Sequence, residues 1–240
     1  MKFRLLLDLP RSASFNMAMD EMLMDVQRRD GAEPCLRFYT WETPAVTCGY
    51  FQKVAEISKR FPKFPVVRRL TGGGPVQHGK DLTFSLTLKD DHLFFRGNIK
   101  DSYLKVSEAL RNGLQPHYPG LDYADCRNAL SPRGRGERIC FDQPACYDLL
   151  LNKNKVAGSS QRHTDRAVLY QSSLFLPGEH HRTIEQVLDG FKKYWKADFA
   201  ERSLTAEEIE CARQIEKARY LSEDWCFLPA SFLVKQSGQL

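Results

Sequence analysis

The stretch of the chain that most restricts its fold is residues 68–86, RRLTGGGPVQHGKDLTFSL. Three consecutive glycines follow the apolar, β-branched segment FPVVRRL, and a run in which Leu82, Phe84 and Leu86 alternate with polar residues comes after them. Alternation with a period of two is typical of a half-buried strand. The pattern therefore predicts a sheet in which a glycine-rich loop joins one strand to the next.

The same stretch partly matches a phosphate-binding P-loop. Residues 74–80, GPVQHGK, fit the start of the P-loop pattern, but Asp81 stands where a hydroxyl should bind magnesium. A P-loop also opens into a helix whose amides hold the anion, whereas a strand is predicted here. A nucleotide P-loop is therefore disfavoured, which leaves a plain glycine-rich turn or a pocket of another kind.

Composition is that of an ordinary globular chain, with 42% hydrophobic and 27% charged residues. The N-terminal segment MKFRLLLDLPRS has only a three-leucine apolar core between charges, so residues 2–9 are expected to form a strand rather than a signal peptide. No apolar run approaches the length of a membrane span. The net charge of +5 favours an acidic protein partner over nucleic acid, because no aromatic–basic stripe or nucleic-acid motif accompanies it.

The seven cysteines are odd in number and irregularly spaced. Without a signal peptide, this pattern is typical of free thiols in a reducing cytoplasm. No Cys-x-x-Cys pair occurs, so no structural zinc or other metal site is expected.

Helices and strands can be placed by periodicity. A helix is expected over residues 15–26 with Ser12 or Ser14 as N-cap, and another over 101–112 that ends at Gly113 as a C′ residue. Two C-terminal helices are expected to begin with capping boxes, Thr183 with Gln186 and Thr205 with Glu208. The expected strands are CLRFYTW, PAVTCGYF, the pair FPVVRRL and LTFSLTL, a hairpin turning at residues 152–154, and AVLYQSSLFL.

No linker or repeat divides the chain. Strands cluster in the middle, while helices lie mainly at the ends and between hairpins, so we expect an α+β fold with a mixed sheet rather than a repeating βαβ arrangement. The whole of residues 1–240 is predicted to form one domain, with residues 181–240 as a helical C-terminal part.

Cys140 is the first candidate for chemistry. It lies in GERICFDQPACYD, just after Arg133, Arg135 and Arg138, and a basic loop would favour a thiolate. The alternative is a buried thiol beside Phe141, which is the commoner role of a free cysteine. The residues alone leave both interpretations open.

Lys155 and His78 are two further candidates. Lys155 begins KVAGSSQ, where small residues on an expected strand leave room for a ligand and the ammonium could bind a carboxylate, phosphate or oxyanion. The alternative is a solvated hairpin lysine. His78 could act as a general base or form a polar pocket wall, although a lone histidine is more often structural.

Four segments in order resemble the lipoate–octanoate transferase and ligase family, whose catalytic domain is shared with biotin protein ligases. They are FNMAMDE (15–21), LRFYTWETPAVTCGYFQ (36–52), VRRLTGGGPVQHGKDLTFSL (67–86) and KVAGSSQRH (155–163), and the likeness is clearest over residues 1–180. The resemblance implies a fold like that of biotin protein ligase catalytic domains. It also implies that the triple-glycine segment wraps an acyl chain, because glycine lets the backbone come close to a ligand.

The segment CFDQPACYDLLLNKNKVAGSSQ resembles the branch of the family in which Cys-Phe-Asp-x-Pro precedes the lysine strand. That likeness implies Cys140 as the nucleophile and Lys155 as its partner, while Gly74 and Pro75 depart from the usual octanoyltransferase pattern. The substrate-binding residues that the resemblance implies are Arg37, Tyr39, Arg69, Thr71, Gly72, Gly73, Gly74, His78, Gly158, Ser159 and Ser160.

The expected activity is that of a cytoplasmic octanoyl-[acyl-carrier-protein]:protein N-octanoyltransferase without cofactor or metal. Octanoyl-acyl carrier protein is the implied donor, and a lipoyl domain or glycine-cleavage H-type protein the implied acceptor, with no nucleic acid and no membrane involved. An ATP-dependent lipoate–protein ligase is the alternative within the family. If the protein is not an enzyme, the alternative is a non-catalytic acyl- or biotin-binding module.

Overall fold

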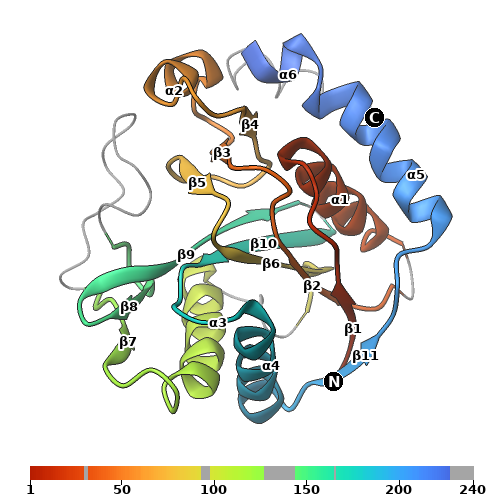
Figure 1. Ribbon diagram of the computed structural model, residues 1–240. Coiled ribbons are helices and arrows are strands. Elements are labelled where there is room, and N and C mark those ends of the chain that lie inside the picture. Colours follow the sequence, from red (N-terminus) through yellow and green to blue (C-terminus); the bar gives the residue numbers. More distant parts are fainter. Residues whose placement is uncertain (30–31, 93–97, 127–143, 165, 228–240) are drawn as a thin grey trace.

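The computed structural model describes residues 1–29, 32–92, 98–126, 144–164 and 166–227 (Figure 1). A large mixed sheet runs through the molecule, with strand order β11-β1-β2-β6-β10-β9-β8-β7. Strand β1 pairs in parallel with both β2 and β11, and the remaining pairs are antiparallel. Its strands are β1 (Lys2–Leu7), β2 (Cys35–Tyr39), β6 (Leu82–Lys89), β7 (Leu121–Tyr123), β8 (Leu149–Leu151), β9 (Asn154–His163), β10 (Ala167–Leu174) and β11 (Asp198–Glu201).

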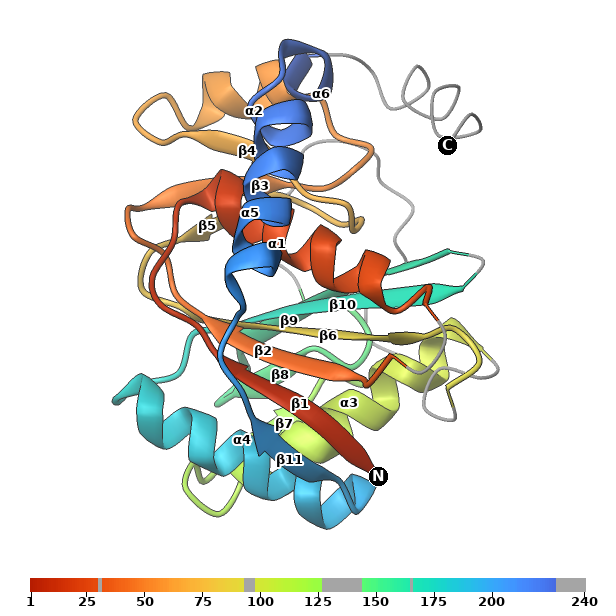
Figure 2. The same ribbon diagram turned by 90° about the vertical axis from the view of Figure 1, so that its right-hand side faces the viewer.

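Helices cover both faces of this sheet, as Figure 2 shows. Helices α3 (Ile99–Leu114) and α4 (His180–Trp195) lie on one face, and α1 (Ala13–Val26) and α5 (Ala206–Ile215) lie on the other. The main core forms between the sheet and α3 and α4, where leucines and aromatic rings such as Phe84, Tyr170 and Phe191 are fully buried. A π-helical turn (Glu216–Tyr220) and the short α6 (Glu223–Phe227) extend α5.

A second, three-stranded sheet lies on the α1 side of the large sheet (Figure 2). Its order is β4-β3-β5, and α2 packs on it through a small core that includes Val46, Cys48, Val54 and Ile57. The elements are β3 (Ala45–Cys48), α2 (Val54–Arg60), β4 (Val66–Arg68) and β5 (Val76–His78). The glycines thus link strand to strand, but they join β4 to the short strand β5 and not directly to the alternating strand β6 that the sequence places next.

The expected α+β fold with a mixed sheet is confirmed, and so are several local predictions. Ser12 caps α1 by accepting from the Phe15 amide, and Thr205 forms a capping box with Glu208. The β8–β9 hairpin turns at residues 152–153, which have positive φ.

Three expectations about local structure are wrong. Helix α4 begins at residue 180 and has Glu179 as its N-cap, so Thr183 lies within its first turn rather than at the cap. Gly113 is interior to α3, where a Cβ would come within 1.9 Å of the Gln186 carbonyl oxygen. The FPVVRRL and LTFSLTL strands do not pair, because β4 belongs to the small sheet and β6 to the large one.

Candidate active site

A pocket lies where the small sheet, the large sheet and α1 meet. Six of the residues expected from the sequence line it: Tyr39, Arg69, His78, Gly158, Ser159 and Ser160. Lining residues that the sequence analysis missed include Met17, Trp41, Thr47, Val76, Thr83 and Gln171. The pocket wall therefore combines apolar and aromatic side chains with hydroxyl groups from strands β9 and β10.

Arg69 holds the glycine-rich loop at the edge of this pocket. Its Nη2 donates to the carbonyl oxygens of Gly72 at 2.5 Å and Gly74 at 2.9 Å, and its Nε donates to Thr71 Oγ1 at 3.1 Å. Gly73 has a φ of +92°, a conformation that side-chain-bearing residues rarely adopt. Thr71 and Gly72 to Gly74 thus shape the loop around Arg69, and the structure does not place them among the residues that line the pocket.

His78 is buried in the pocket wall and fixed on three sides. Its Nδ1 lies 2.8 Å from Asp81 Oδ2, and its Nε2 lies 2.8 Å from Thr47 Oγ1. Its ring stacks on Trp41, with the ring centroids 3.8 Å apart. The imidazole is therefore held in one orientation, which suits a pocket wall that presents a fixed surface to a ligand.

Asp81, which breaks the P-loop pattern, is the carboxylate partner of His78. Burial raises the pKa of Asp81, but the His78 ring and hydrogen bonds from the Gly79 amide and the Thr83 hydroxyl outweigh it, so the net pKa lies below its ordinary value. The Thr83 hydroxyl in turn accepts from Trp41 Nε1 at 3.1 Å. Asp81 thus orders both rings of the stacked pair.

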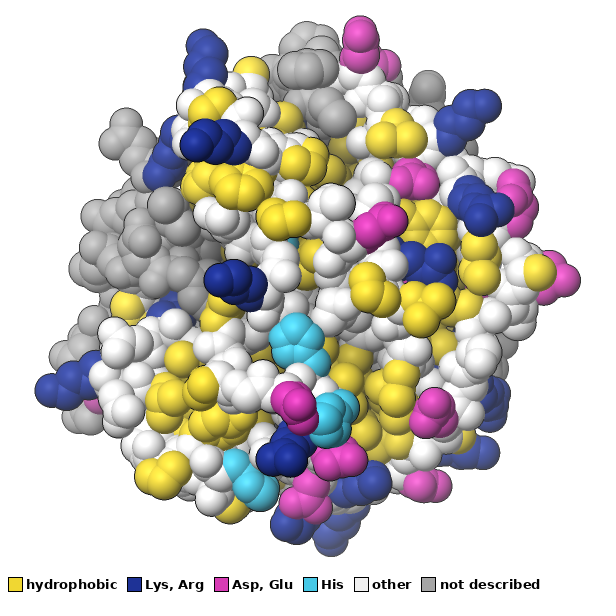
Figure 3. Space-filling model, in the orientation of Figure 1, with side chains coloured by type: hydrophobic (Ala, Val, Ile, Leu, Met, Phe, Trp, Pro, Cys, Tyr) yellow, Lys and Arg dark blue, Asp and Glu magenta, His cyan; other side chains and the backbone are white. Residues whose placement is uncertain are grey.

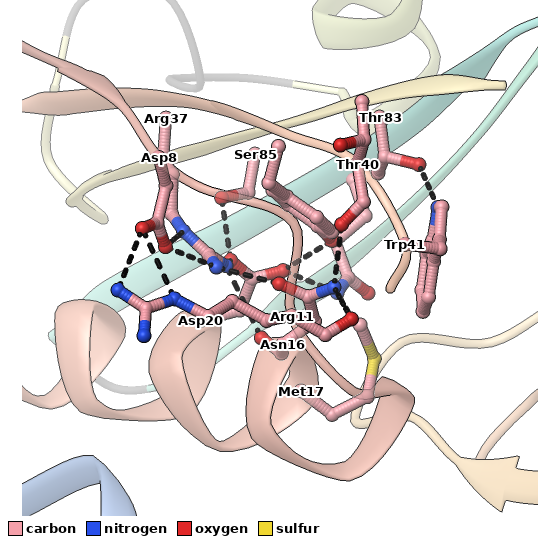
Figure 4. Close-up of polar contacts among 12 residues, drawn as sticks. Asp8, Arg11, Asn16, Met17, Asp20, Arg37, Thr40, Trp41, Thr83 and Ser85 are labelled. Carbon is pink, nitrogen blue, oxygen red and sulfur yellow. Dashed lines mark hydrogen bonds and ion pairs between the residues drawn. The ribbon is translucent and has the colours of Figure 1, made fainter. Parts of the chain in front are cut away.

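Arg37 does not line the pocket, although the resemblance implies that it binds substrate. Its side chain has 0% exposure and lies between two carboxylates, with Asp8 Oδ2 2.7 Å from Nη2 and Asp20 Oδ1 2.8 Å from Nη1 (Figure 4). Asn16 on α1 accepts two further hydrogen bonds from the guanidinium through its carbonyl and side-chain oxygens. Arg37 therefore fastens α1 to strand β2.

Gln171 connects the buried cluster of Arg37, Asp8 and Asp20 to the pocket. Asp20 Oδ2 accepts from Gln171 Nε2 at 2.7 Å and from the Tyr39 hydroxyl at 2.9 Å. Gln171 Oε1 then accepts from the Thr71 hydroxyl at 2.7 Å, and Thr71 Oγ1 accepts from Ser160 Oγ at 2.8 Å. The glutamine and two serines in the middle of the otherwise apolar AVLYQSSLFL are the signal that could have marked this strand as part of the pocket.

Lys155 lies at the start of strand β9, with its side chain only 3% exposed. Its Nζ is 2.6 Å from Asp148 Oδ2, and strand β9 continues from there to Gly158, Ser159 and Ser160 in the pocket wall. The buried position excludes the solvated hairpin lysine that the sequence left open. Lys155 itself is not among the pocket-lining residues.

Cys140 and the three arginines before it lie outside the described residues. On either side of that segment, Cys126 and Cys146 form a disulfide, with their Cα atoms 4.4 Å apart. The expectation of free thiols is therefore wrong for these two cysteines. Among the described residues, Cys35 is a buried free thiol, Cys211 is an exposed free thiol, and Cys48 is buried.

In the part of the chain that the structure describes, no group of three or more His, Cys, Asp or Glu residues is arranged to hold a metal ion. None of the described helices has both the length and the apolar character needed to cross a membrane.

Solved structures share this fold. A T. acidophilum protein solved with bound lipoic acid superposes with a TM-score of 0.76 at 23% identity and covers 94% of this chain and 99% of that one. A lipoate-protein ligase A bound with ATP gives a TM-score of 0.75, also at 23% identity, over 94% of this chain and 98% of that one. At this level of identity the likeness concerns the fold.

Sequence relatives are closer. The chain is 30% identical to "Octanoyltransferase LipM" of Bacillus anthracis, over 89% of this chain and 94% of that protein. It is also 30% identical to the LipM of Geobacillus kaustophilus, with the same coverage of both chains. The model of the lipoyl protein ligase A/B catalytic domain matches residues 12–209. The resemblance inferred from the four sequence segments is thereby confirmed, and the chain belongs to the lipoyl protein ligase A/B catalytic domain family.

Proposed function

We propose that the protein transfers an octanoyl group in lipoate biosynthesis, from acyl carrier protein to a lysine of a lipoyl domain, through a thioester on Cys140. Relatives named as octanoyltransferases match the chain over most of its length. The structural observation that carries the proposal is the buried Lys155 at the start of the strand that forms the pocket wall.

The first half-reaction forms the acyl-enzyme. The Cys140 thiol gives up its proton, and its sulfur attacks the carbonyl carbon of the octanoyl thioester. The bond between that carbon and the carrier sulfur then breaks, and the departing thiolate takes up a proton. An ammonium such as that of Lys155 favours the attacking thiolate and stabilises the oxyanion of the tetrahedral intermediate.

The second half-reaction passes the acyl group to the acceptor. A neutral lysine amine attacks the Cys140 thioester, the carbon–sulfur bond breaks, and the amine loses a proton while the cysteine regains one. Exchange between thioesters is nearly isoenergetic and amide formation runs downhill, so neither step consumes ATP. The acceptor class is a lipoyl domain or a glycine-cleavage H-type protein.

The described pocket suits an acyl chain that ends in a polar carbonyl. Met17, Trp41 and Val76 offer apolar surface, while Ser159 and Ser160 bring hydroxyl groups to the same wall. Ligand pockets of this kind combine a mostly apolar lining with a few polar groups that fix the orientation of the ligand.

Intact-mass analysis after incubation with octanoyl-acyl carrier protein tests the proposal. We expect one octanoyl group on the protein without ATP, none on the Cys140→Ala variant, and normal acylation of Cys211→Ser, which removes an exposed free thiol instead. Octanoyl transfer to a lipoyl domain by the Cys140→Ala protein would overturn the thioester mechanism. Transfer that requires ATP would favour a ligase instead, and no modification of either protein would favour a binding module.

Lys155→Ala tests the role of the lysine. Loss of an oxyanion-stabilising donor typically slows a reaction by about 10²- to 10³-fold, so we expect acylation of Cys140 to slow by that order. Lys153→Asn is the matched control, because Lys153 is an exposed lysine on the same hairpin with a φ of 70°, which asparagine tolerates. Equal acylation rates for the two variants would remove Lys155 from the mechanism.

A further inference from the structure

Asp148 joins Lys155 to the turn that precedes strand β8. Its Oδ2 lies 2.6 Å from Lys155 Nζ and accepts a hydrogen bond of 2.6 Å from the backbone amide of Ala145. The two charged side chains are nearly inaccessible, at 7% exposure for Asp148 and 3% for Lys155. One carboxylate oxygen therefore connects the candidate catalytic lysine with a residue five positions after Cys140 in the sequence.

The turn at residues 145–148 is held from two sides. The Asp148 amide donates to the Ala145 carbonyl at 3.1 Å, and Ser107 Oγ on α3 donates to the Tyr147 carbonyl at 2.7 Å. Across the β8–β9 hairpin, Leu150 pairs with Lys155. Because the turn is fastened to both α3 and β9, the Asp148 carboxylate has a fixed position relative to Lys155.

The electrostatics of the pair depend on burial. Burial raises the pKa of Asp148, while the Lys155 ammonium and backbone amides lower it, with a net pKa above the ordinary value. Tyr170 on β10 also faces this carboxyl group, and burial raises the pKa of its phenol so far that it stays neutral. A buried ammonium without an opposite charge nearby loses its proton easily, so the carboxylate favours the charged form of the lysine.

We infer that Asp148 is a positioning residue that keeps the Lys155 ammonium protonated and oriented for acylation of Cys140. The inference rests on the proposed function. An ammonium has three N–H groups, so an ion pair with one carboxylate is compatible with stabilising a thiolate or an oxyanion. A buried ion pair is weak evidence for stability alone, because apolar residues of similar size often stabilise a fold equally well.

The test compares the pH dependence of acyl-enzyme formation in three variants, with octanoyl-acyl carrier protein as donor. In Asp148→Asn the lysine keeps a hydrogen-bonding neighbour but loses the opposite charge. We expect the alkaline limb of its rate profile to move to lower pH by about one to three units. Asp148→Glu keeps the carboxylate, so its limb should stay in place even where the rate falls. Asp122→Asn, on the neighbouring strand β7 with a side chain that is 68% exposed, is the control and should match the parent protein.

Three outcomes would overturn the inference. A limb that stays in place in Asp148→Asn, with only a uniform fall in rate or stability, would show that Asp148 is merely structural. If Asp148→Asn does not fold, the pH profile of Asp148→Glu provides the test. An alkaline limb that moves in Asp148→Glu, although the carboxylate is kept, would contradict the inference. A parent protein that forms no acyl-enzyme would overturn the proposed function as well, so the two failures are distinguishable.

Discussion

The imidazole of His78 lies nearly parallel to the indole of Trp41, at an interplanar angle of 21° and a centroid separation of 3.8 Å. Both rings depend on Asp81, His78 through a direct contact and Trp41 through the Thr83 hydroxyl. Trp41 belongs to the connection between β2 and β3, whereas His78 ends β5, so the stack joins the two sheets at the pocket. A single buried carboxylate thus fixes a wall of the candidate site.

Asp81→Asn should therefore lower the free energy of unfolding at neutral pH. Loss of hydrogen bonds to a charged group typically costs about 1.5–3 kcal/mol. Because the pKa of Asp81 is depressed in the folded protein, its stabilisation is complete above the unfolded-state value of about 3.9 and is lost as the pH falls through the folded-state value. Urea unfolding of both proteins should show a gap in stability at neutral pH that closes below about pH 4. A gap of equal size in acid would contradict this account.

Much of the fold follows from local sequence patterns. The i, i+3, i+4 apolar spacing and Ser12 identify α1, and the alternation after the glycines identifies β6. The hairpin at residues 152–153 follows from turn chemistry in the same way. These elements depend on interactions between residues near one another in sequence, so the chain itself carries the signal.

The parts that the sequence did not predict depend on distant contacts. Arg37 resembles a substrate-binding residue in the sequence, yet its partners Asp8 and Asp20 lie 29 and 17 residues away. Gly113 resembles a helix C-cap, yet the approach of α4 explains it. Gln171 interrupts an otherwise apolar strand, yet its role depends on Thr71, 100 residues away. Local patterns contain no information on which of these segments meet.

Arg37→Met should destabilise the protein strongly. Removing one partner of a buried ion pair leaves uncompensated charge, at a typical cost of about 3–5 kcal/mol, and here Asp8 and Asp20 both lose their shared partner. Arg28→Met is the control, because its pair with Asp25 is about half exposed and should contribute less than about 1 kcal/mol. If Arg37→Met instead kept the parent stability and lost only substrate affinity, the direct substrate contact implied by the resemblance would be correct.

Cysteine labelling in the native state should separate the described free thiols. Burial raises the pKa of Cys35 to about 12, so little thiolate forms at neutral pH, and the side chain is also inaccessible. Cys211 is exposed. With iodoacetamide, peptide mass analysis should find Cys211 modified quickly and Cys35 only after unfolding. Equal labelling of both would show that strand β2 opens in the native protein. The Cys211→Ser variant removes labelling of the exposed Cys211 thiol from experiments on Cys140.

Two glycines offer a direct comparison between folding and ligand binding. Gly113 packs so closely on α4 that Gly113→Ala should destabilise the protein, since the added Cβ would lie 1.9 Å from the Gln186 carbonyl oxygen. Gly72 differs: its backbone has no positive φ of the kind that favours glycine, and no atom lies within 4 Å of an added Cβ. Gly72→Ala should therefore leave the unfolding free energy within about 0.5 kcal/mol of the parent value, as is usual for a substitution that disturbs no contact.

The glycine-rich loop is nevertheless expected to approach the acyl chain, so Gly72→Ala should raise the KM for octanoyl-acyl carrier protein while the fold is retained. Urea unfolding and steady-state kinetics on the same preparation measure the two effects separately. A variant with parent stability and parent KM would mean that the backbone at Gly72 does not come close to the substrate. Arg69 would then remain as the residue that connects this loop to the pocket, because its guanidinium both lines the pocket and binds the Gly72 carbonyl.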